Sequence, residues 1–535
     1  MKTNIGKYIF ITIVLILIFS SLYIFFANKK AEDTGIENKN NISETQYSKT
    51  LNIAIYNFDS INPILSQNKD VINISKLIFQ PLIELDENYK IQFKLAKECV
   101  KIEGKKYIIK LNNNIQWQDG QIFTAKDVEY TINEIKKIES SIYYDEAKNI
   151  ENIEIIDDYT LKINLKNIDN FLKYHLTFPI LANHIYENED LKTSNIIPLG
   201  TGCFKIKQLD SKDTSKIILK KNQYYKNNNE NNENNEDGNG IEEINILLYN
   251  NMNDIYNNFK IDNIDIIHIA SSNFREYIGN INYNIKEYKG REYEYLSLNC
   301  KDEILSKKEV RQALSYSINK SRIISEIGNY YIANFPLDYT DILFQNEDET
   351  YNIEKAKEIL QNENWNFQNN KWQKYSNGKL LTLSLNMIVQ SENSQRLKVA
   401  EEIKKQLQEI GIIINIKQVS NSKYEMYLKD KDYQLILTGI NNGFSPSLEY
   451  FYGDNNLAQY ENTDLRNQIR EIDEYNIASE KYNNYISTVY KDCAYIGLYR
   501  NKEMLILSQN VNGEILPNNY SIFYNIYTWK KVLKN

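Results

Sequence analysis

Histidine is nearly absent from this sequence of 535 residues. The three histidines are His175, His184 and His268. No two of them lie four residues apart, the spacing by which one helix presents two imidazoles to zinc. A histidine-based metal centre is therefore not expected, and no cofactor is predicted.

Cysteine is also scarce. The four cysteines are Cys99, Cys203, Cys300 and Cys493. They are far apart and form no C-x-x-C pair or other spacing typical of a zinc site. Buried free thiols are the expected state, although one disulfide could form if the folded part of the chain is exported.

The chain lacks an excess of positive charge, since 63 Lys and Arg stand against 71 Asp and Glu and the net charge is −8. A nucleic-acid-binding protein needs a basic face to neutralise phosphates, so no nucleic-acid partner is expected. The motifs G-x-S-x-G, P-loop and H-E-x-x-H are also missing. Acids suited to a glycosidase are plentiful, but a solvated surface explains them. The protein is therefore not expected to be an enzyme.

One long uncharged run stands at the N-terminus. Residues 9–27, IFITIVLILIFSSLYIFFA, carry no charge over nineteen residues, enough to span a bilayer. The run ends in bulky residues rather than at a small-x-small cleavage site, which favours an uncleaved anchor over a cleaved signal peptide. Residues 1–27 are predicted to anchor the protein in the cell membrane with the bulk of the chain on the extracytoplasmic face. The polar residues 28–50 are predicted to form a flexible tether.

Strand and helix patterns alternate along the rest of the chain, which predicts an α/β protein with two or three domains. Residues 380–389 and 412–419 have strand patterns, and residues 394–410 between them have the pattern of a helix that Gly411 ends. This order predicts a βαβ unit with parallel strands. The low-complexity residues 226–240 are expected to form a surface loop. Further strands are predicted at 51–56, 107–111 and 433–438.

Residues 117–130, WQDGQIFTAKDVEY, predict a turn followed by a helix. Asp-Gly is a turn signal. Thr124 and Asp127 have the spacing of an N-cap and a short capping box. The apolar residues of the helix share one face, which leaves Tyr130 pointing elsewhere and free for another role. These apolar residues are Val128, Ile132 and Ile135.

A second capped helix is predicted at residues 305–314, LSKKEVRQAL. Ser306 and Glu309 have the spacing of a capping box. Arg311 is expected to lie off the buried face and to pin a neighbouring loop or carboxylate.

Several short segments occur in an order that resembles a known family. They are Asn62-Pro63, FQPL at 79–82, WQDGQIFTAKDV at 117–128, ILANH at 180–184, PLGTGCF at 198–204, Asn299, VRQAL at 310–314 and AKEIL at 356–360. From about Leu51 to its C-terminus the chain resembles the oligopeptide/dipeptide/nickel class of extracytoplasmic solute-binding proteins, solute-binding protein family 5, which serve ABC importers.

The resemblance implies a two-lobed α/β fold of the periplasmic-binding-protein class II type with an extra subdomain in lobe I, here preceded by the predicted transmembrane helix. Lobe I is placed at residues 51–290 plus 500–535 and lobe II at residues 291–499, with junctions near Arg291 and Arg500. The implied protein is a monomer that binds a small peptide or peptide-like solute and delivers it to ABC importer permease subunits. A membrane-anchored sensory or adaptor protein that uses the same fold without transport is the alternative.

The resemblance also implies where ligand binds. Two candidate segments follow predicted strands, at the strand ends where α/β proteins tend to bind ligands. Tyr130 joins them because the corresponding tyrosine of the family lies near ligand. The candidate ligand-binding residues are Tyr56, Asn57, Phe58, Tyr130, Gly439, Ile440, Asn441 and Asn442.

The sequence departs from the family at two places. Peptide-binding members usually carry an aspartate shortly after the strand that ends here at Gly439, and it pairs with the peptide's α-ammonium. This chain reads GINNGFSP at 439–446 and has no acid before Glu449. A buried ammonium without a carboxylate is costly, so a free-amine peptide is a weaker expectation than the resemblance suggests. A Leu-x-x-Cys lipoprotein site is also missing near Ala27.

Overall fold

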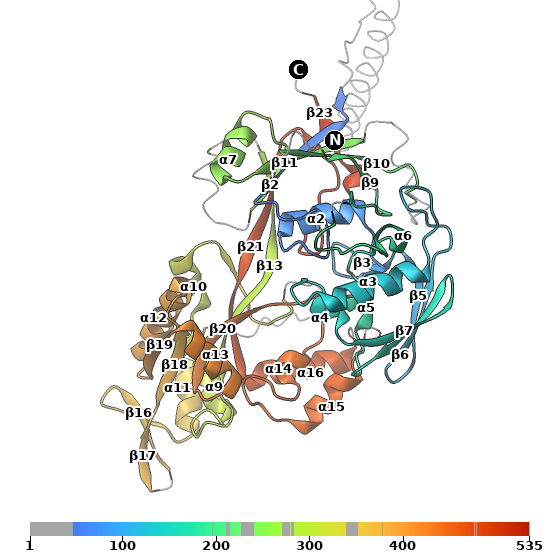
Figure 1. Ribbon diagram of the computed structural model, residues 1–535. Coiled ribbons are helices and arrows are strands. Elements are labelled where there is room, and N and C mark those ends of the chain that lie inside the picture. The colour runs from blue at the N-terminus through green and yellow to red at the C-terminus, as the bar shows by residue number, and fades with distance from the viewer. Residues whose placement is uncertain are drawn as a thin grey trace, which may run out of the picture. The chain divides into compact units, whose positions relative to one another are not determined.

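The structure is a computed structural model (Figure 1). It describes residues 46–194, 196–209, 215–225, 240–269, 279, 283–338, 351–376, 378–473, 475, 477 and 479–533. The predicted anchor, most of the predicted tether and residues 226–239 of the predicted surface loop lie outside the described residues. Among the helices that are described, none is both long and apolar enough to cross a membrane.

One mixed sheet of eleven strands organises the described residues. The long antiparallel strands β13 (Tyr283–Leu298) and β21 (Tyr495–Ser508) lie at its centre and connect its two halves, the half from β13 to β19 and the half from β21 to β9 (Figure 1). The path along the sheet is β19 (Ile413–Val419), β18 (Ser384–Gln390), β20 (Leu435–Asn441), β13 (Tyr283–Leu298), β21 (Tyr495–Ser508), β12 (Ile266–Ile269), β2 (Thr50–Tyr56), β11 (Glu243–Tyr249), β10 (Lys216–Lys221) and β9 (Phe204–Leu209), with β14 (Tyr330–Ile332) paired to β21.

The ladder between β13 and β21 is irregular at the place where the lobe junctions are predicted. Its register shifts between Lys289 and Tyr293, and Tyr293 then faces Arg500. The predicted junctions, Arg291 and Arg500, both lie at this irregularity. The lobe boundaries themselves stay a prediction.

The predicted βαβ unit is present on the β19 side of the sheet. Helix α12 (Ser394–Glu409) connects β18 to β19, and the two strands pair in parallel. Gly411 follows the helix with a φ of +87°. The prediction of one strand over 380–389 is wrong, because the chain changes sheets at the fully buried Leu383. Before it, β17 (Lys379–Thr382) belongs to a separate sheet with β15 (Asn366–Gln368) and β16 (Lys371–Ser376).

The WQDG segment forms the predicted scaffold in the other half. Helix α3 (Ala125–Lys137) begins after Thr124, whose backbone N–H donates to Asp127 Oδ2 at 2.8 Å, so the predicted capping box is confirmed. The other oxygen of Asp127 accepts from the Asn183 N–H at 2.8 Å, which fixes helix α6 (Asn183–Tyr186) beside α3. The predicted apolar face is fully buried. Its residues are Val128, Ile132 and Ile135.

The second predicted capping box is wrong. Helix α9 (Lys308–Ser317) begins later than expected, and the Ser306 hydroxyl donates to the Glu303 carbonyl at 3.3 Å. Asp302 instead caps the preceding turn by accepting from two backbone N–H groups. Arg311 is 3% exposed rather than off the buried face. It does pin a neighbouring loop, since its Nη1 donates to the Leu305 carbonyl at 2.9 Å. Its Nε donates to the carbonyl of Asp492, the last residue of another helix, at 2.9 Å.

The expected tether ends earlier than residue 50. Strand β1 (Tyr47–Ser48) pairs with β23 (Lys530–Val532), so the chain is already part of a small sheet there. All four cysteines belong to the described residues and are free thiols; Cys99 and Cys493 are buried as expected, whereas Cys203 and Cys300 are half-buried.

The remaining elements complete both halves. A four-stranded antiparallel sheet follows the order β5 (Ala96–Glu103), β6 (Lys106–Leu111), β8 (Thr160–Leu165) and β7 (Ile150–Asp157). The other short strands are β3 (Ile83–Leu85), β4 (Ile91–Phe93) and β22 (Val511–Asn512). The other helices are α2 (Lys69–Ile78), α4 (Tyr144–Ala147), α5 (Leu172–His175), α7 (Met252–Lys260), α10 (Lys320–Ile327), α11 (Ile353–Asn362), α13 (Asn421–Asp430), α14 (Glu449–Tyr452), α15 (Thr463–Glu471), α16 (Glu480–Asp492) and the 3₁₀ helix η1 (Ile526–Thr528).

A buried charge network joins α2, β12, β13 and β21. His268 Nδ1 lies 2.7 Å from Asp70 Oδ1, and its Nε2 lies 3.2 Å from Glu503 Oε2. The Tyr288 hydroxyl donates to Glu503 Oε2 at 3.0 Å, and Lys69 forms an ion pair with the same carboxylate. Burial lowers the pKa of His268, but hydrogen bonds to Asp70 and Glu503 outweigh it and raise the pKa to about 9.

This network predicts a loss of stability at alkaline pH. The pKa of His268 is higher in the folded chain than its ordinary value of 6.5. Its contribution to the free energy of unfolding is therefore complete below pH 6.5 and is lost as the pH rises through about 9. Urea unfolding of wild type and His268→Gln at pH 6, 8 and 10 measures how the free energy of unfolding depends on pH in each protein. The wild type should lose more stability across this range than the variant, and equal losses would contradict the prediction.

Candidate functional site

The candidate segment 439–442 lies at the end of β20. The expectation that it follows the strand is wrong for its first three residues, because antiparallel pairing with β13 continues until Asn441 faces Glu292. Gly439 is a close-packing position, since a Cβ there would lie 2.2 Å from Glu294 Oε1. That carboxylate is held by a two-pronged ion pair with Arg396, with both N–O distances 2.8 Å.

A cavity of about 230 Å³ lies beside this strand end. Its walls carry backbone, hydroxyl, amide and apolar groups, and no wall residue has a charged side chain. We call it the β20 cavity. Its lining residues are Pro336, Leu337, Ile440, Asn441, Asn442, Gly443, Ser445, Ser447, Tyr450 and Phe451. The structure therefore brings three of the predicted site residues, Ile440 to Asn442, to one cavity.

Asn442 has a structural role in this wall. Its side chain is 4% exposed, and its Nδ2 donates to the Pro336 carbonyl. Its backbone N–H donates to the Arg291 carbonyl at 3.0 Å. Arg500 Nη2 donates to the same Pro336 carbonyl at 2.7 Å, so the cavity wall is tied to the middle of β21. Asn441 is exposed, and among the described residues its side-chain amide makes no comparable hydrogen bond to the cavity wall.

The loop after the cavity carries Phe444 into contact with one residue from the first part of the chain and one from the C-terminal part. Its ring stacks on Tyr89 with centroids 6.3 Å apart and meets Tyr520 edge-on at 5.4 Å. The Arg291 guanidinium lies over the Phe444 ring, 4.3 Å from its centroid, in a cation–π arrangement. A permanent positive charge therefore lies next to the uncharged cavity.

Sequence reasoning missed this aromatic cluster. Phe444 lies within the quoted segment GINNGFSP, but its role was not foreseen, and Arg291 was named only as a junction. The sequence around Tyr89 and Tyr520 does not predict their ring contacts with Phe444, because these contacts join distant parts of the chain. Burial raises the pKa of Tyr89, although hydrogen bonds from Asn519 lower it, so Tyr89 stays a neutral phenol.

The segment Tyr56-Asn-Phe58 lies away from the β20 cavity. Tyr56 ends β2, and the next residue, Asn57, has a φ of +49°. The Asn68 side chain caps α2 and also donates to the carbonyls of Tyr56 and Asn57 at 2.7 and 2.8 Å. Phe58 packs partly buried against the core of this half. Tyr56 is 38% exposed, so its ring is accessible.

Tyr130 is also separate from the cavity. Its hydroxyl donates to the Tyr186 carbonyl at 3.1 Å, which links α3 to α6. Burial raises the pKa of Tyr130, with Glu134 and Glu187 adding to the effect. The phenol is therefore neutral and engaged in the scaffold. Ligand contact by Tyr130, as by residues 56–58, stays a prediction.

The described residues contain no group of three or more His, Cys, Asp or Glu side chains arranged to hold a metal ion. His175 and His184 instead pair with nearby acids, Glu146 and Asp119 respectively. The site offers hydrogen-bonding and apolar groups suited to holding a solute rather than a nucleophile placed beside a base.

Comparisons with known proteins agree with this chemistry. The sequence model of the "Bacterial extracellular solute-binding proteins, family 5 Middle" matches residues 90–462. The oligopeptide-binding protein AppA of Bacillus subtilis is 23% identical over 503 residues, which cover 88% of this chain and 89% of that protein. The glutathione-binding protein GsiB of Pectobacterium atrosepticum is 22% identical over 67% of each chain.

Solved structures show the same fold. AppA of Bacillus subtilis in complex with a nonapeptide has a TM-score of 0.58 at 21% identity, covering 92% of this chain and 100% of that one. HbpA2 of Haemophilus parasuis has a TM-score of 0.74 at 18% identity, covering 90% and 100%. The predicted two-lobed, mixed α/β fold of periplasmic binding proteins is thereby confirmed. The relatives are binding proteins, so the expectation that the chain is not an enzyme is confirmed as well.

Proposed function

Because the chain belongs to the bacterial extracellular solute-binding proteins of family 5, we propose that it binds a small peptide or peptide-like solute and delivers it to the permease subunits of an ABC importer. It acts as a monomer that closes two lobes around the solute. The proposed contact point is the β20 cavity, and the Tyr56 ring is the proposed contact from lobe I.

The observation that carries this proposal is the size and polarity of the β20 cavity. About 230 Å³ is below the usual range of roughly 300–1,000 Å³ for whole small-molecule sites, so the cavity suits one side chain or end group of a longer solute. Ser445, Ser447 and Asn441 offer hydrogen bonds at its polar walls, while Leu337 and Phe451 supply apolar contact. Such walls fit a neutral peptide group better than a charged one.

The names of the relatives support a peptide-like ligand. One is an oligopeptide-binding protein, others bind glutathione, and one matched structure holds a nonapeptide. Import and the sensory alternative share this binding step. Reconstitution with the cognate permease and ATPase distinguishes them, because an import receptor should stimulate ATP hydrolysis only when it carries solute.

Ligand binding is expected to raise the stability of the protein. A solute that binds only the folded chain adds RT ln(1 + [L]/Kd), roughly 2.7 kcal/mol at a hundredfold excess over Kd. Thermal unfolding with a library of free and N-acetylated short peptides reads this out as a shift in Tm. No shift with any peptide at millimolar concentration would refute the receptor proposal.

We also propose that residues 9–27 anchor the protein in the cell membrane. Their uncharged length suits a bilayer span. The mature protein should then keep residues 1–27 and stay in the membrane fraction after a high-salt wash. N-terminal sequencing that begins beyond Ala27, or release of the protein by salt, would show that the anchor proposal is wrong.

A further inference from the structure

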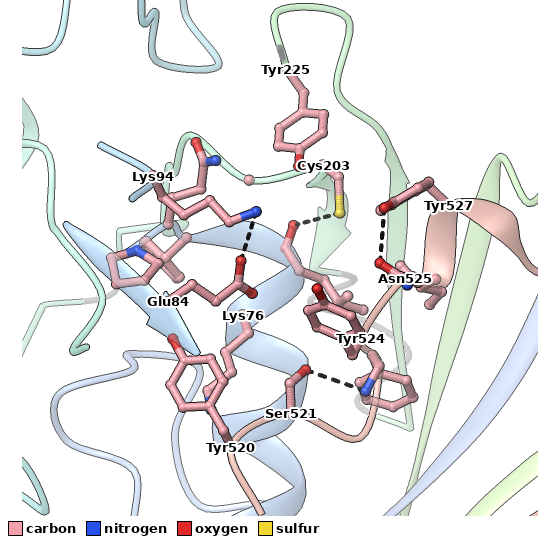
Figure 2. Close-up of a pocket in the computed structure, with 17 residues that line it drawn as sticks. Lys76, Glu84, Lys94, Cys203, Tyr225, Tyr520, Ser521, Tyr524, Asn525 and Tyr527 are labelled. Atoms are coloured by element: carbon pink, nitrogen blue, oxygen red, sulfur yellow. Dashed lines mark hydrogen bonds and ion pairs between the residues drawn. The ribbon is translucent and has the colours of Figure 1, made fainter. Parts of the chain in front are cut away.

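A second, polar cavity lies beside the C-terminal end of α2 (Figure 2) and shares no lining residue with the β20 cavity. We call it the α2 cavity. Its walls come from α2, β3, the turn at Gly202-Cys203 and the C-terminal segment 520–527. Its volume is about 70 Å³. A water molecule needs about 10–15 Å³ in this measure, so the cavity has room for a ligand group of a few heavy atoms.

The charges around the α2 cavity do not balance. Three residues of its walls, Lys76, Glu84 and Lys94, have charged side chains. Lys94 pairs with Glu84 at 2.8 Å, and Lys76 is not part of this pair (Figure 2). Among the described residues, no carboxylate oxygen lies within 4.0 Å of the Lys76 ammonium. The Lys76 ammonium lies over the face of the Tyr520 ring, 3.6 Å from its centroid. A half-buried ammonium held by an aromatic ring alone is under-compensated, and a bound anion would supply the missing charge.

The remaining wall groups suit an anion that is held by hydrogen bonds. Burial raises the pKa of Cys203 to about 12, with Glu84 adding to the effect, so this thiol is neither a nucleophile nor a metal ligand near neutral pH. Burial and nearby acids also raise the pKa of Tyr524, which keeps its hydroxyl a neutral donor. The walls then present one unpaired ammonium and neutral donors, beside the negative charge of Glu84.

We propose that the α2 cavity is a binding site for the carboxylate of a small organic acid, held by Lys76. One net positive charge matches a singly charged carboxylate, whereas Glu84 disfavours a larger dianion such as phosphate. A carboxylate can arrive as a free small acid or as the C-terminus of a larger solute. The site does not depend on the proposed import function.

The charge on Lys76 makes this binding dependent on pH. Burial lowers the pKa of Lys76 to about 7, with Glu84 opposing the shift and Arg291 and Lys69 adding to it. As the pH rises through this value, Lys76 loses its charge and attraction for an anion. The charged fraction falls about tenfold between pH 6 and pH 8, so the affinity for acetate should fall by about the same factor.

Acetate titration followed by calorimetry tests the site directly. Wild type should bind acetate at pH 6, and Lys76→Gln should weaken binding at least tenfold. Lys97→Gln is the matched control, because Lys97 is exposed on β5 and outside the cavity. Equal affinity in wild type and Lys76→Gln would overturn the proposal.

A pair of acetylated dipeptides, one with a free acid and one with an amide terminus, distinguishes a free small acid from the C-terminus of a larger solute as the source of the carboxylate. Displacement of acetate by the dipeptide acid but not by the amide identifies a solute C-terminus.

A second measurement covers the case in which Lys76→Gln fails to fold. NMR titration of the lysine side-chain amines in the wild type should show one lysine with a pKa near 7, and saturating acetate should raise that pKa. No lysine responding to either acetate or the dipeptide acid, together with no calorimetric binding of either, would rule out the site.

Discussion

Replacing Arg500 by methionine is expected to lower the free energy of unfolding by about 3–5 kcal/mol, the typical effect of removing one partner from a buried ion pair. The Arg500 side chain is fully buried in the middle of β21. Its Nε lies 3.0 Å from Asp338 Oδ1, and its two terminal nitrogens donate to the carbonyls of Gly290 and Pro336 at 3.0 and 2.7 Å. Methionine fills a similar volume but leaves these acceptors, and the Phe335 carbonyl to which Arg500 Nη2 also donates at 3.5 Å, without this donor.

The matched control for this change is Arg470→Met. Arg470 pairs with Asp454 at 2.6 Å, but both side chains are more than half exposed. An exposed pair contributes about 0–1 kcal/mol, so the control should unfold close to wild type. Chemical denaturation of wild type, Arg500→Met and Arg470→Met measures the free energy of unfolding of each. A loss of less than 1 kcal/mol in Arg500→Met would show that the guanidinium is not needed where β13 and β21 change register.

The same change should also weaken solute binding. The Pro336 carbonyl accepts from both Arg500 and the Asn442 side chain. Without Arg500, the Pro336 wall of the β20 cavity is held by Asn442 alone. The junction between the predicted lobes and the candidate site are therefore parts of one hydrogen-bonded unit.

Local signals were enough to predict the elements whose ends are determined by nearby residues. The helix after Thr124 begins as expected, because the residues that cap it and the residues of its buried face lie close together in the sequence. The βαβ unit around α12 was predictable for the same reason. At α9 the local signal failed, since Ser306 belongs to the preceding turn, where its hydroxyl donates to the Glu303 carbonyl, and the helix begins after Lys307 without a side-chain cap. The spacing of a capping box does not show whether its first residue is taken up by an earlier turn.

The site was predictable only in part, for a related reason. Residues 440–442 were found because they end a recognisable strand and match a family segment. The strand itself runs further than its own residues indicate, because β13 offers partners up to Glu292. The contacts of Phe444 with Tyr89 and Tyr520 join segments far apart in the chain, and the α2 cavity arises where the C-terminal segment packs beside α2. No local pattern records such contacts.

The missing acid of this site predicts a ligand preference that one substitution should reverse. Gly443 lines the β20 cavity, and a Cβ there would meet no atom closer than Ser445 N at 3.9 Å. Gly443→Asp therefore has room for its Cβ and adds a carboxylate to a residue that lines the cavity. Asn442→Asp is a poorer choice, because its carboxylate would face the Pro336 carbonyl that the Asn442 amide now serves.

Gly443→Asp should favour free-amine peptides over N-acetylated ones by about tenfold relative to wild type, a change of about 1.4 kcal/mol. A hydrogen bond to a charged group contributes about 1.5–3 kcal/mol, against about 0.5–1.5 for a neutral one. The nearby guanidinium of Arg291, which lies over the Phe444 ring, partly neutralises the new carboxylate and limits the gain. Gly443→Asn is the matched control, because it has the same shape without the charge and should leave the preference of wild type unchanged. Calorimetric titration at pH 7 with one peptide in free and acetylated forms measures the effect, since the carboxylate and most α-amines are charged there. A wild type that already prefers the free amine strongly would mean that another acid, such as Glu449, receives the ammonium and that the β20 cavity is not where the peptide begins.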